Sequence, residues 1–243
     1  MKEYLVFRLY GPMASWGVPA VGGDRATAIA PTRSALLGLL GAALGITTDN
    51  AEKLEALQQS VSFGVKQCVP SSILRDYHTA QVPSEKRGVT HLTRKSELSE
   101  AKLNTVLSSR DYRCDGVWVV AVWLRANPQV ALSAIKAALE KPVFPLYLGR
   151  KSCPLSLPLS PKTIETETLQ QALDTDFPPV VSEQSDKYWF GANGFVTYFW
   201  EGAVTEFDGE LTQSYQPWDE PVHRGRWQFK KRTMHQLTLR EAK

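Results

Sequence analysis

One segment, residues 31–45, constrains the fold most, because it specifies a helix with a defined start and a defined end. Pro31 fits only at the start of a helix, and Thr32 or Ser34 can cap the free amides there. Gly45 suits the left-handed residue that ends many helices. Apolar residues recur at helical spacing and predict a side that packs on a core, at Leu36, Leu40 and Leu44.

The opposite side of this helix carries only small residues, at Ser34, Gly38, Gly41 and Gly45. A glycine inside a helix costs about 1 kcal/mol relative to alanine, so the stripe indicates a surface that another group approaches closely. Tight packing on a sheet is one reading. The other reading is an anion site at the helix start, where free N–H groups and the positive dipole end lie beside Arg33 and Arg25. We expect these two arginines to hold a phosphate.

The length of 243 residues allows one large domain or two small ones. The longest apolar run is about a dozen residues, short of the ~20 that span a bilayer, so we expect no membrane partner. The first residues carry charge inside what would be the apolar part of a signal peptide. Three scattered cysteines form no CxxC pair and are typical of a reducing compartment. We expect a cytoplasmic protein.

Charge is distributed unevenly although the whole chain carries only +3. Residues 1–161 carry +7, residues 162–220 carry −10, and residues 221–243 carry +6. This pattern indicates that the basic parts meet a polyanion, unless the acidic and basic segments neutralise each other on folding.

Alternation and helical spacing predict a βαβ order, a long insertion, and then a β-strand and a helix. The expected strands are residues 4–10, 61–67 and 116–124, and the expected helices are residues 31–45, 50–59 and 127–140, with a possible short helix at 96–107. This order is that of an α+β, ferredoxin-like or RRM-like (βαββαβ) fold. Residues 11–31 form a long loop, in which Trp16 is either an anchor or a base-stacking platform.

A cluster of prolines between residues 142 and 161 indicates a boundary. We therefore divide the chain into an RRM-like domain, residues 1–155, and a smaller β-rich C-terminal part, residues 156–243. Residues 188–200 and 226–239 are expected to be strands of that part. Either could instead complete the sheet of the first domain.

Five segments, taken in order, resemble the CasD family, the 5′-handle-binding RAMP subunits of type I-E CRISPR Cascade surveillance complexes. They are residues 4–8, 11–17, 31–41, 74–79 and 147–154, and the resemblance covers residues 1 to about 160. It implies a RAMP domain with a thumb inserted at about residues 76–113. It further implies that the chain caps the 5′ handle of a CRISPR RNA for antiviral DNA targeting. The implied protein partners are the backbone subunit and the large subunit of the complex, and target DNA is a further candidate.

The resemblance matches Arg110 to a thumb arginine and Tyr147 to a tyrosine, both of which contact the handle. Arg150 and Lys151 are added from their charge and placement, as Arg25 and Arg33 are. Phosphate contacts position an RNA, whereas reading a single strand needs base edges and stacking. For that second role we favour Arg110, Tyr147 and Trp16.

Two other functions remain open. A related subfamily cleaves CRISPR RNA without metal, using a tyrosine and a lysine–histidine pair. This chain has no Lys-His dipeptide, but Tyr77, His78 and His91 could act as acid and base. The second alternative is a scaffold that bridges proteins without touching RNA. No cysteine or histidine spacing fits a metal, so we expect no metal, no cofactor and no catalytic residue.

Overall fold

Strand β1 (Lys2–Tyr10) lies inside a sheet, because apolar side chains cover both of its faces. The computed structural model describes residues 1–240 apart from 21, 86, 190–193, 208–210, 224, 225 and 227. In it, β1 runs antiparallel to β7 (Val117–Leu124), with Phe7 opposite Val120. The predicted pairing of the first and central strands is therefore confirmed.

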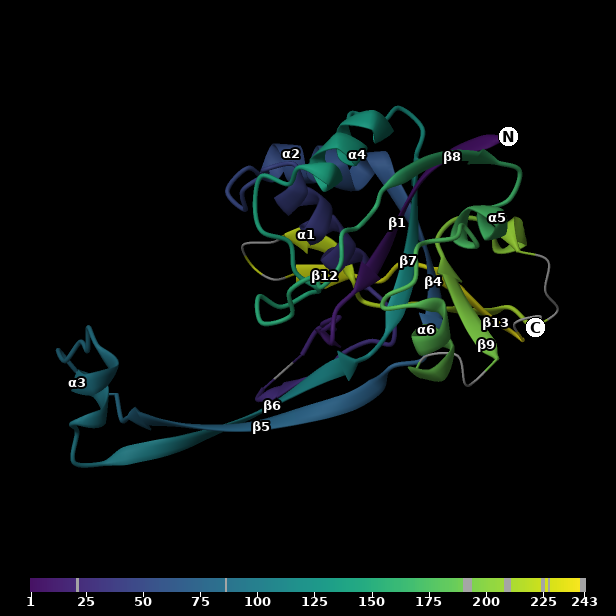
Figure 1. Cartoon of the computed structure of the whole chain (residues 1–243). Coiled ribbons are helices and arrows are strands. Elements are labelled where there is room, and N and C mark those ends of the chain that lie inside the picture. The colour runs from purple at the N-terminus through teal and green to yellow at the C-terminus, as the bar shows by residue number, and fades with distance from the viewer. Residues whose placement is uncertain are drawn as a thin grey trace.

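Seven strands form this sheet in the order β10-β13-β9-β4-β7-β1-β8, and every neighbouring pair is antiparallel (Figure 1). The remaining five strands are β4 (Val61–Val69), β8 (Lys162–Thr166), β9 (Phe195–Trp200), β10 (Gln213–Tyr215) and β13 (Met234–Arg240). Strand β8 joins the free edge of β1, and β9 joins the free edge of β4. Strands from both sides of the predicted boundary at residue 155 thus belong to one continuous sheet.

Three helices cover one face of the sheet, α1 (Arg33–Ala43), α2 (Ala51–Ser60) and α4 (Leu132–Glu140). The Thr32 hydroxyl accepts a hydrogen bond from the Ala35 amide at 3.4 Å, so α1 is capped as its sequence predicts. Leu36 and Leu40 pack with Phe7 in the core under these helices. Helix α4 begins only at Leu132, later than expected, and Pro128 lies in the irregular segment before it.

The opposite face packs on α5 (Leu169–Leu173), whose two leucines contact a core that includes Val6 and Trp200. Two further short helices on the chain are α6 (Glu183–Trp189) and η1 (Val204–Glu206). The strand expected at 188–200 therefore begins only at Phe195, since residues 188 and 189 end a helix. None of the helices in the described ranges is long and apolar enough to span a bilayer.

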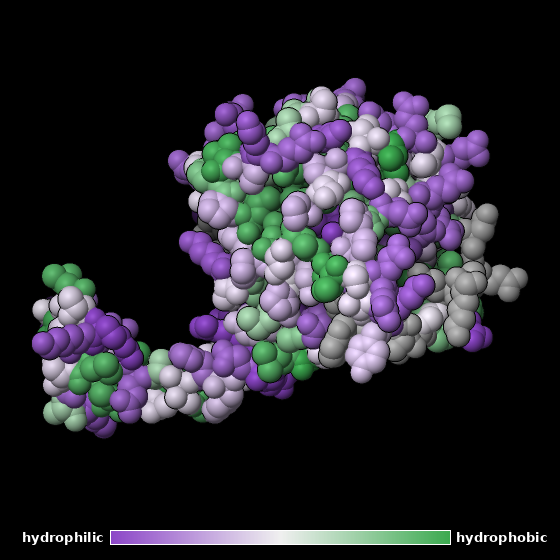
Figure 2. Space-filling model, viewed as in Figure 1, coloured by the Kyte–Doolittle hydropathy of each residue, from purple (hydrophilic) through white to green (hydrophobic). Residues whose placement is uncertain are grey.

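A two-stranded arm, β5 (Ser72–Pro83) and β6 (Leu103–Cys114), projects from the body and carries α3 (Arg94–Leu98) at its tip (Figure 1). Figure 2 shows the arm standing clear of the body, with hydrophilic and hydrophobic residues mixed on its surface. The helix expected at residues 96–107 is wrong beyond Leu98. Water surrounds most of the arm on both sides, so its strands lack the apolar alternation that identifies a half-buried strand.

Two small sheets complete the fold. Short strands β2 (Met13–Ala14) and β3 (Asp24–Arg25) flank the base of β6, and β11 (Glu220–His223) pairs with β12 (Gln228–Lys230). The strand expected at residues 226–239 is thus two strands, β12 and β13. Residue 227, within that range, lies outside the described residues.

Candidate nucleic-acid interface

The base of the arm brings together arginines that are far apart in the sequence. Strand β3 runs parallel to β6 and places Arg25 directly opposite Arg110, with both side chains exposed. Two neighbouring cations repel each other, and an anion bound between them would relieve that repulsion. The structure therefore juxtaposes two of the predicted site residues.

The loop of residues 147–154 adds a third arginine to this place. The loop is pinned to the body because the Leu148 carbonyl accepts from the Ser15 amide at 2.9 Å. Gly149 has a φ of +86°, and a Cβ there would lie 1.9 Å from the Ser15 carbonyl oxygen. Only glycine permits this close approach. The pinned loop lets Arg150 donate from Nη2 to the Arg25 carbonyl at 3.2 Å.

Arg150 keeps a donor without a partner. Its guanidinium lies over the Tyr112 ring, 5.0 Å from the centroid. Its Nη1 atom is shielded from solvent and has no hydrogen-bond partner within the described part of the chain. Tyr112 and Arg110 point to the same side of β6, since alternate residues of a strand share a face. We name Arg25, Arg110 and Arg150 the arginine junction.

The two remaining predicted residues that lie close by are Tyr147 and Lys151. Tyr147 is 36% exposed and forms a bridge with Pro154 across the loop. Lys151 is exposed in the same turn. Both side chains are therefore accessible beside the arginine junction.

Sequence reasoning missed an ion pair between β5 and β6, close to this junction along the strand. Arg75 donates from Nε and Nη2 to the two oxygens of Asp111 at 2.8 and 3.0 Å. The hydrogen bond from Arg75 holds the pKa of Asp111 below its usual range. Asp111 is thus held as a carboxylate by another arginine. The register Arg75↔Asp111 would have revealed the pair only if the arm had been recognised as a hairpin.

The expectation that Arg33 holds a phosphate is contradicted. Arg33 is 1% exposed, and its guanidinium forms ion pairs with Glu220 at 2.6 Å and Glu201 at 2.9 Å. The Arg33 amide, at the start of α1, donates to Asp219 Oδ2 at 2.8 Å. The start of α1 does bind anions, but these anions are carboxylates of the chain's own acidic segment, residues 162–220.

The expectation that Trp16 stacks on a base is also contradicted. Trp16 is 1% exposed and packs edge-on against Trp118, with centroids 5.2 Å apart. Its amide donates to Thr27 Oγ1 at 2.8 Å, which closes the loop of residues 11–31. Trp16 therefore anchors that loop in the core.

The candidate acid–base residues of a nuclease lie apart from one another. Tyr77 and His78 are consecutive and exposed on β5, so their side chains point to opposite faces of the arm. His91 lies near the arm tip, with Nδ1 2.8 Å from Ser96 Oγ and Nε2 3.8 Å from Glu100. In the residues that the structure describes, no group of three or more metal-ligating side chains converges.

A family model described as CRISPR-associated protein (Cas_Cas5) matches residues 4–235 of the chain. The CRISPR system Cascade subunit CasD of Escherichia coli (strain K12) is 41% identical over 189 residues, which are 74% of this chain and 79% of that protein. A chain of a CRISPR RNA-guided surveillance complex superposes with a TM-score of 0.65 and 24% identity, covering 98% of this chain and 90% of the other. A further Cas protein crystal structure gives 0.62 and 22% identity, covering 98% and 95%. These two superpositions match the mixed α+β fold with its large antiparallel sheet.

Proposed function

Because the chain belongs to the Cas5 family of CRISPR-associated proteins, we propose that it is the Cascade subunit that caps the 5′ handle of the CRISPR RNA. The arginine junction is the observation that carries this proposal. It presents three cations at one place, and this arrangement suits the phosphates of a single strand. Tyr147 and Lys151 lie beside it for stacking and further charge neutralisation.

The proposed domain organisation has an RRM-like unit at its centre. Four strands support it, since β8, β1, β7 and β4 follow one another in the sheet with helices α1, α2 and α4 on one face. This is the strand order 4-1-3-2 of the βαββαβ fold, with β8 as the fourth strand. The arm of residues 72–114 is the proposed thumb. Strands β9, β10 and β13 then extend the sheet as the C-terminal part.

The proposed partners follow from the family. They are the CRISPR RNA, the backbone subunit and the large subunit of a type I-E complex, with target DNA as a further candidate for the basic residues 221–243. Three carboxylates of the acidic segment 162–220, those of Glu201, Asp219 and Glu220, are already paired with Arg33 or Arg232. We place this function in the cytoplasm, where the three free cysteines would remain reduced.

The test compares two double variants that remove the same charge. Arg110→Ala/Arg150→Ala removes two cations of the arginine junction, whereas Lys136→Ala/Lys141→Ala removes two cations at and just after α4. Binding of handle-bearing RNA is measured over a salt series. For a single strand the slope of log K against log salt is about −0.7 per phosphate contact. We expect the first variant to bind more weakly, with a slope shallower by about 1.4, and the second to match the wild type.

Equal affinities and slopes for both variants would place the RNA elsewhere. Equal losses in both would mean that only net charge matters, and the junction would then have no particular role.

A further inference from the structure

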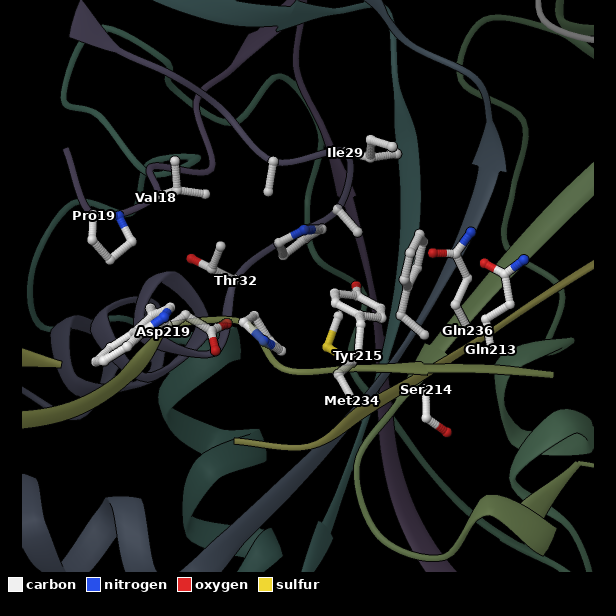
Figure 3. A pocket seen from close by; sticks show the side chains of 16 residues that line it. Val18, Pro19, Ile29, Thr32, Gln213, Ser214, Tyr215, Asp219, Met234 and Gln236 are labelled. Atoms are coloured by element: carbon white, nitrogen blue, oxygen red, sulfur yellow. The ribbon is translucent and has the colours of Figure 1, made fainter. Parts of the chain in front are cut away.

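A cavity of about 640 Å³ lies between residues 18, 19 and 28–32 on one side and the C-terminal strands on the other (Figure 3). The first side contributes Val18, Pro19 and Ile29, and the opposite wall comes from residues 213–219 with Met234. The volume falls in the usual range of about 300–1,000 Å³ for small-molecule sites. The cavity therefore has room for a group the size of a nucleotide.

The middle of the cavity is aromatic and accessible. Tyr215 is 39% exposed and Trp218 is 53% exposed, and both line the cavity together with the buried Phe199. Partial burial raises the pKa of Tyr215 to about 12, so its hydroxyl stays uncharged. Half-exposed aromatic rings at a cavity are the usual stacking surfaces for unpaired bases.

Two glutamine side-chain amides make one end of the cavity polar. Gln213 and Gln236 lie directly opposite each other in the β10–β13 pair, and Figure 3 shows their amides side by side. Within the described ranges of the chain, neither side-chain amide has a hydrogen-bond partner. Each amide offers two donors and one acceptor, which match the donor and acceptor pattern of a base edge.

The surrounding charge also suits a nucleotide. Lys231 Nζ lies 5.3 Å from the centroid of the ring of Trp218, which lines the cavity. The nearby carboxylate of Asp219 is neutralised by Arg232, at 2.6 and 2.9 Å, and so would not repel a phosphate strongly. Residues 28–32 line this cavity and follow Arg25 closely in the chain, so the segment from Arg25 to Thr32 borders both the cavity and the arginine junction.

We propose that this cavity binds one unpaired nucleobase, stacked on Trp218 and Tyr215 and contacted at its edge by Gln213 and Gln236. The inference rests on the proposed RNA-binding function and adds a second contact point for the same strand. An apolar side chain of a partner protein is the other conceivable occupant. It would leave both amides buried and unpaired, which is unfavourable because a buried polar group without a partner loses its hydrogen bonds to water.

The experiment uses the full chain and handle-bearing RNA. Trp218→Ala removes a stacking face, and Gln236→Leu keeps the shape but removes an amide. Tyr188→Ala removes an exposed aromatic of α6 that does not line the cavity. We expect Trp218→Ala to weaken RNA binding by about 5- to 150-fold, the range of a single stacked base. Gln236→Leu should also weaken it, while Trp218→Phe should restore most of the affinity and Tyr188→Ala should have no effect.

Crosslinking with ultraviolet light supplies a direct readout that does not depend on affinity. The bound RNA should crosslink to the peptide that contains Tyr215 and Trp218. A wild-type affinity in both Trp218→Ala and Gln236→Leu, with no crosslink there, overturns the proposal. If Arg110→Ala/Arg150→Ala still weakens binding in that case, the proposed function survives and only the cavity assignment fails.

Two further arms separate the source of the occupant. Free AMP, GMP, CMP and UMP are each tested for a change in melting temperature that depends on Trp218. Such a change, without an effect of Trp218→Ala on RNA binding, would make the cavity a site for free nucleotides and overturn the assignment to the RNA. Unchanged RNA binding together with lost assembly with the other Cascade subunits would instead assign the cavity to a protein, and would overturn it equally.

Discussion

At the scale of single residues, the chain uses arginines of two kinds. Arg33 is enclosed by Glu201 and Glu220 and lies over the Phe63 ring, whereas Arg110 is exposed beside Arg25. Removing a buried charge from water is costly, and only close partners repay that cost. The first kind therefore stabilises the fold, and the second kind is available to a ligand.

Arg33→Met should destabilise the protein severely. The substitution keeps a long side chain but leaves Glu220 and part of Glu201 without a cation in the interior, so we expect a loss of about 3–5 kcal/mol in the free energy of unfolding. Urea unfolding followed by circular dichroism measures it. Arg94→Met is the control, because Arg94 pairs with Glu97 on the surface of the arm, where such pairs contribute about 0–1 kcal/mol. A similarly small loss for both variants would show that the buried pair contributes little.

At the scale of elements, helix α1 shows that its small-residue stripe has more than one cause. Gly41 lies against Leu54 of α2, where an added Cβ would be in ordinary contact at 3.5 Å. Gly45 has a φ of +70°, and its Cβ would lie 2.9 Å from a methyl group of Val143. A Cβ added at Gly38 would have no neighbouring atom within 4 Å. The expected close approach thus holds at Gly45 and not at Gly38.

Two alanine substitutions in this stripe should have opposite signs. Gly38→Ala should raise the free energy of unfolding by up to about 1 kcal/mol, because alanine favours a helix and meets no neighbour. Gly45→Ala should lower the free energy of unfolding, because alanine is strained in the left-handed backbone conformation and its Cβ would lie too close to Val143. Thermal unfolding of the isolated chain measures both. A lower melting temperature for Gly38→Ala would contradict the open space seen beside that residue.

At the scale of the whole molecule, one sheet contains strands from both the basic and the acidic segments of the sequence. Strands β9, β10 and β13 extend the sheet beyond β4, and carboxylates of the acidic segment reach the start of α1. The negative and positive segments therefore neutralise each other in part within the fold. The exposed cations that remain include those at the base of the arm.

The chain by itself should not cleave CRISPR repeat RNA. Metal-free cleavage needs a base and an acid that converge on one phosphate, whereas Tyr77 and His78 point to opposite faces of β5. The purified protein and its His78→Ala variant are incubated with repeat RNA in EDTA and the products are separated on a gel. We expect intact RNA in both reactions. Cleavage that disappears in the variant would make the Tyr77–His78 segment an active site.

The sequence by itself determined the elements around the core. Proline, threonine and glycine at the two ends of α1, and apolar runs in β1 and β7, act through neighbours a few residues away, and such local signals can be read from one chain. The strands of the arm were missed because water on both sides removes the alternation that would reveal them.

Only the tertiary structure decided which cations are free. Arg33 and Arg110 are the same residue type, and both were expected to contact RNA. Arg33 forms an ion pair with Glu201, 168 residues away in the chain, whereas Arg110 is exposed opposite Arg25. Ion pairing is set by distances in space between residues remote in sequence, and no local pattern encodes it. The same holds for Trp16, a loop residue whose partner Trp118 lies in β7.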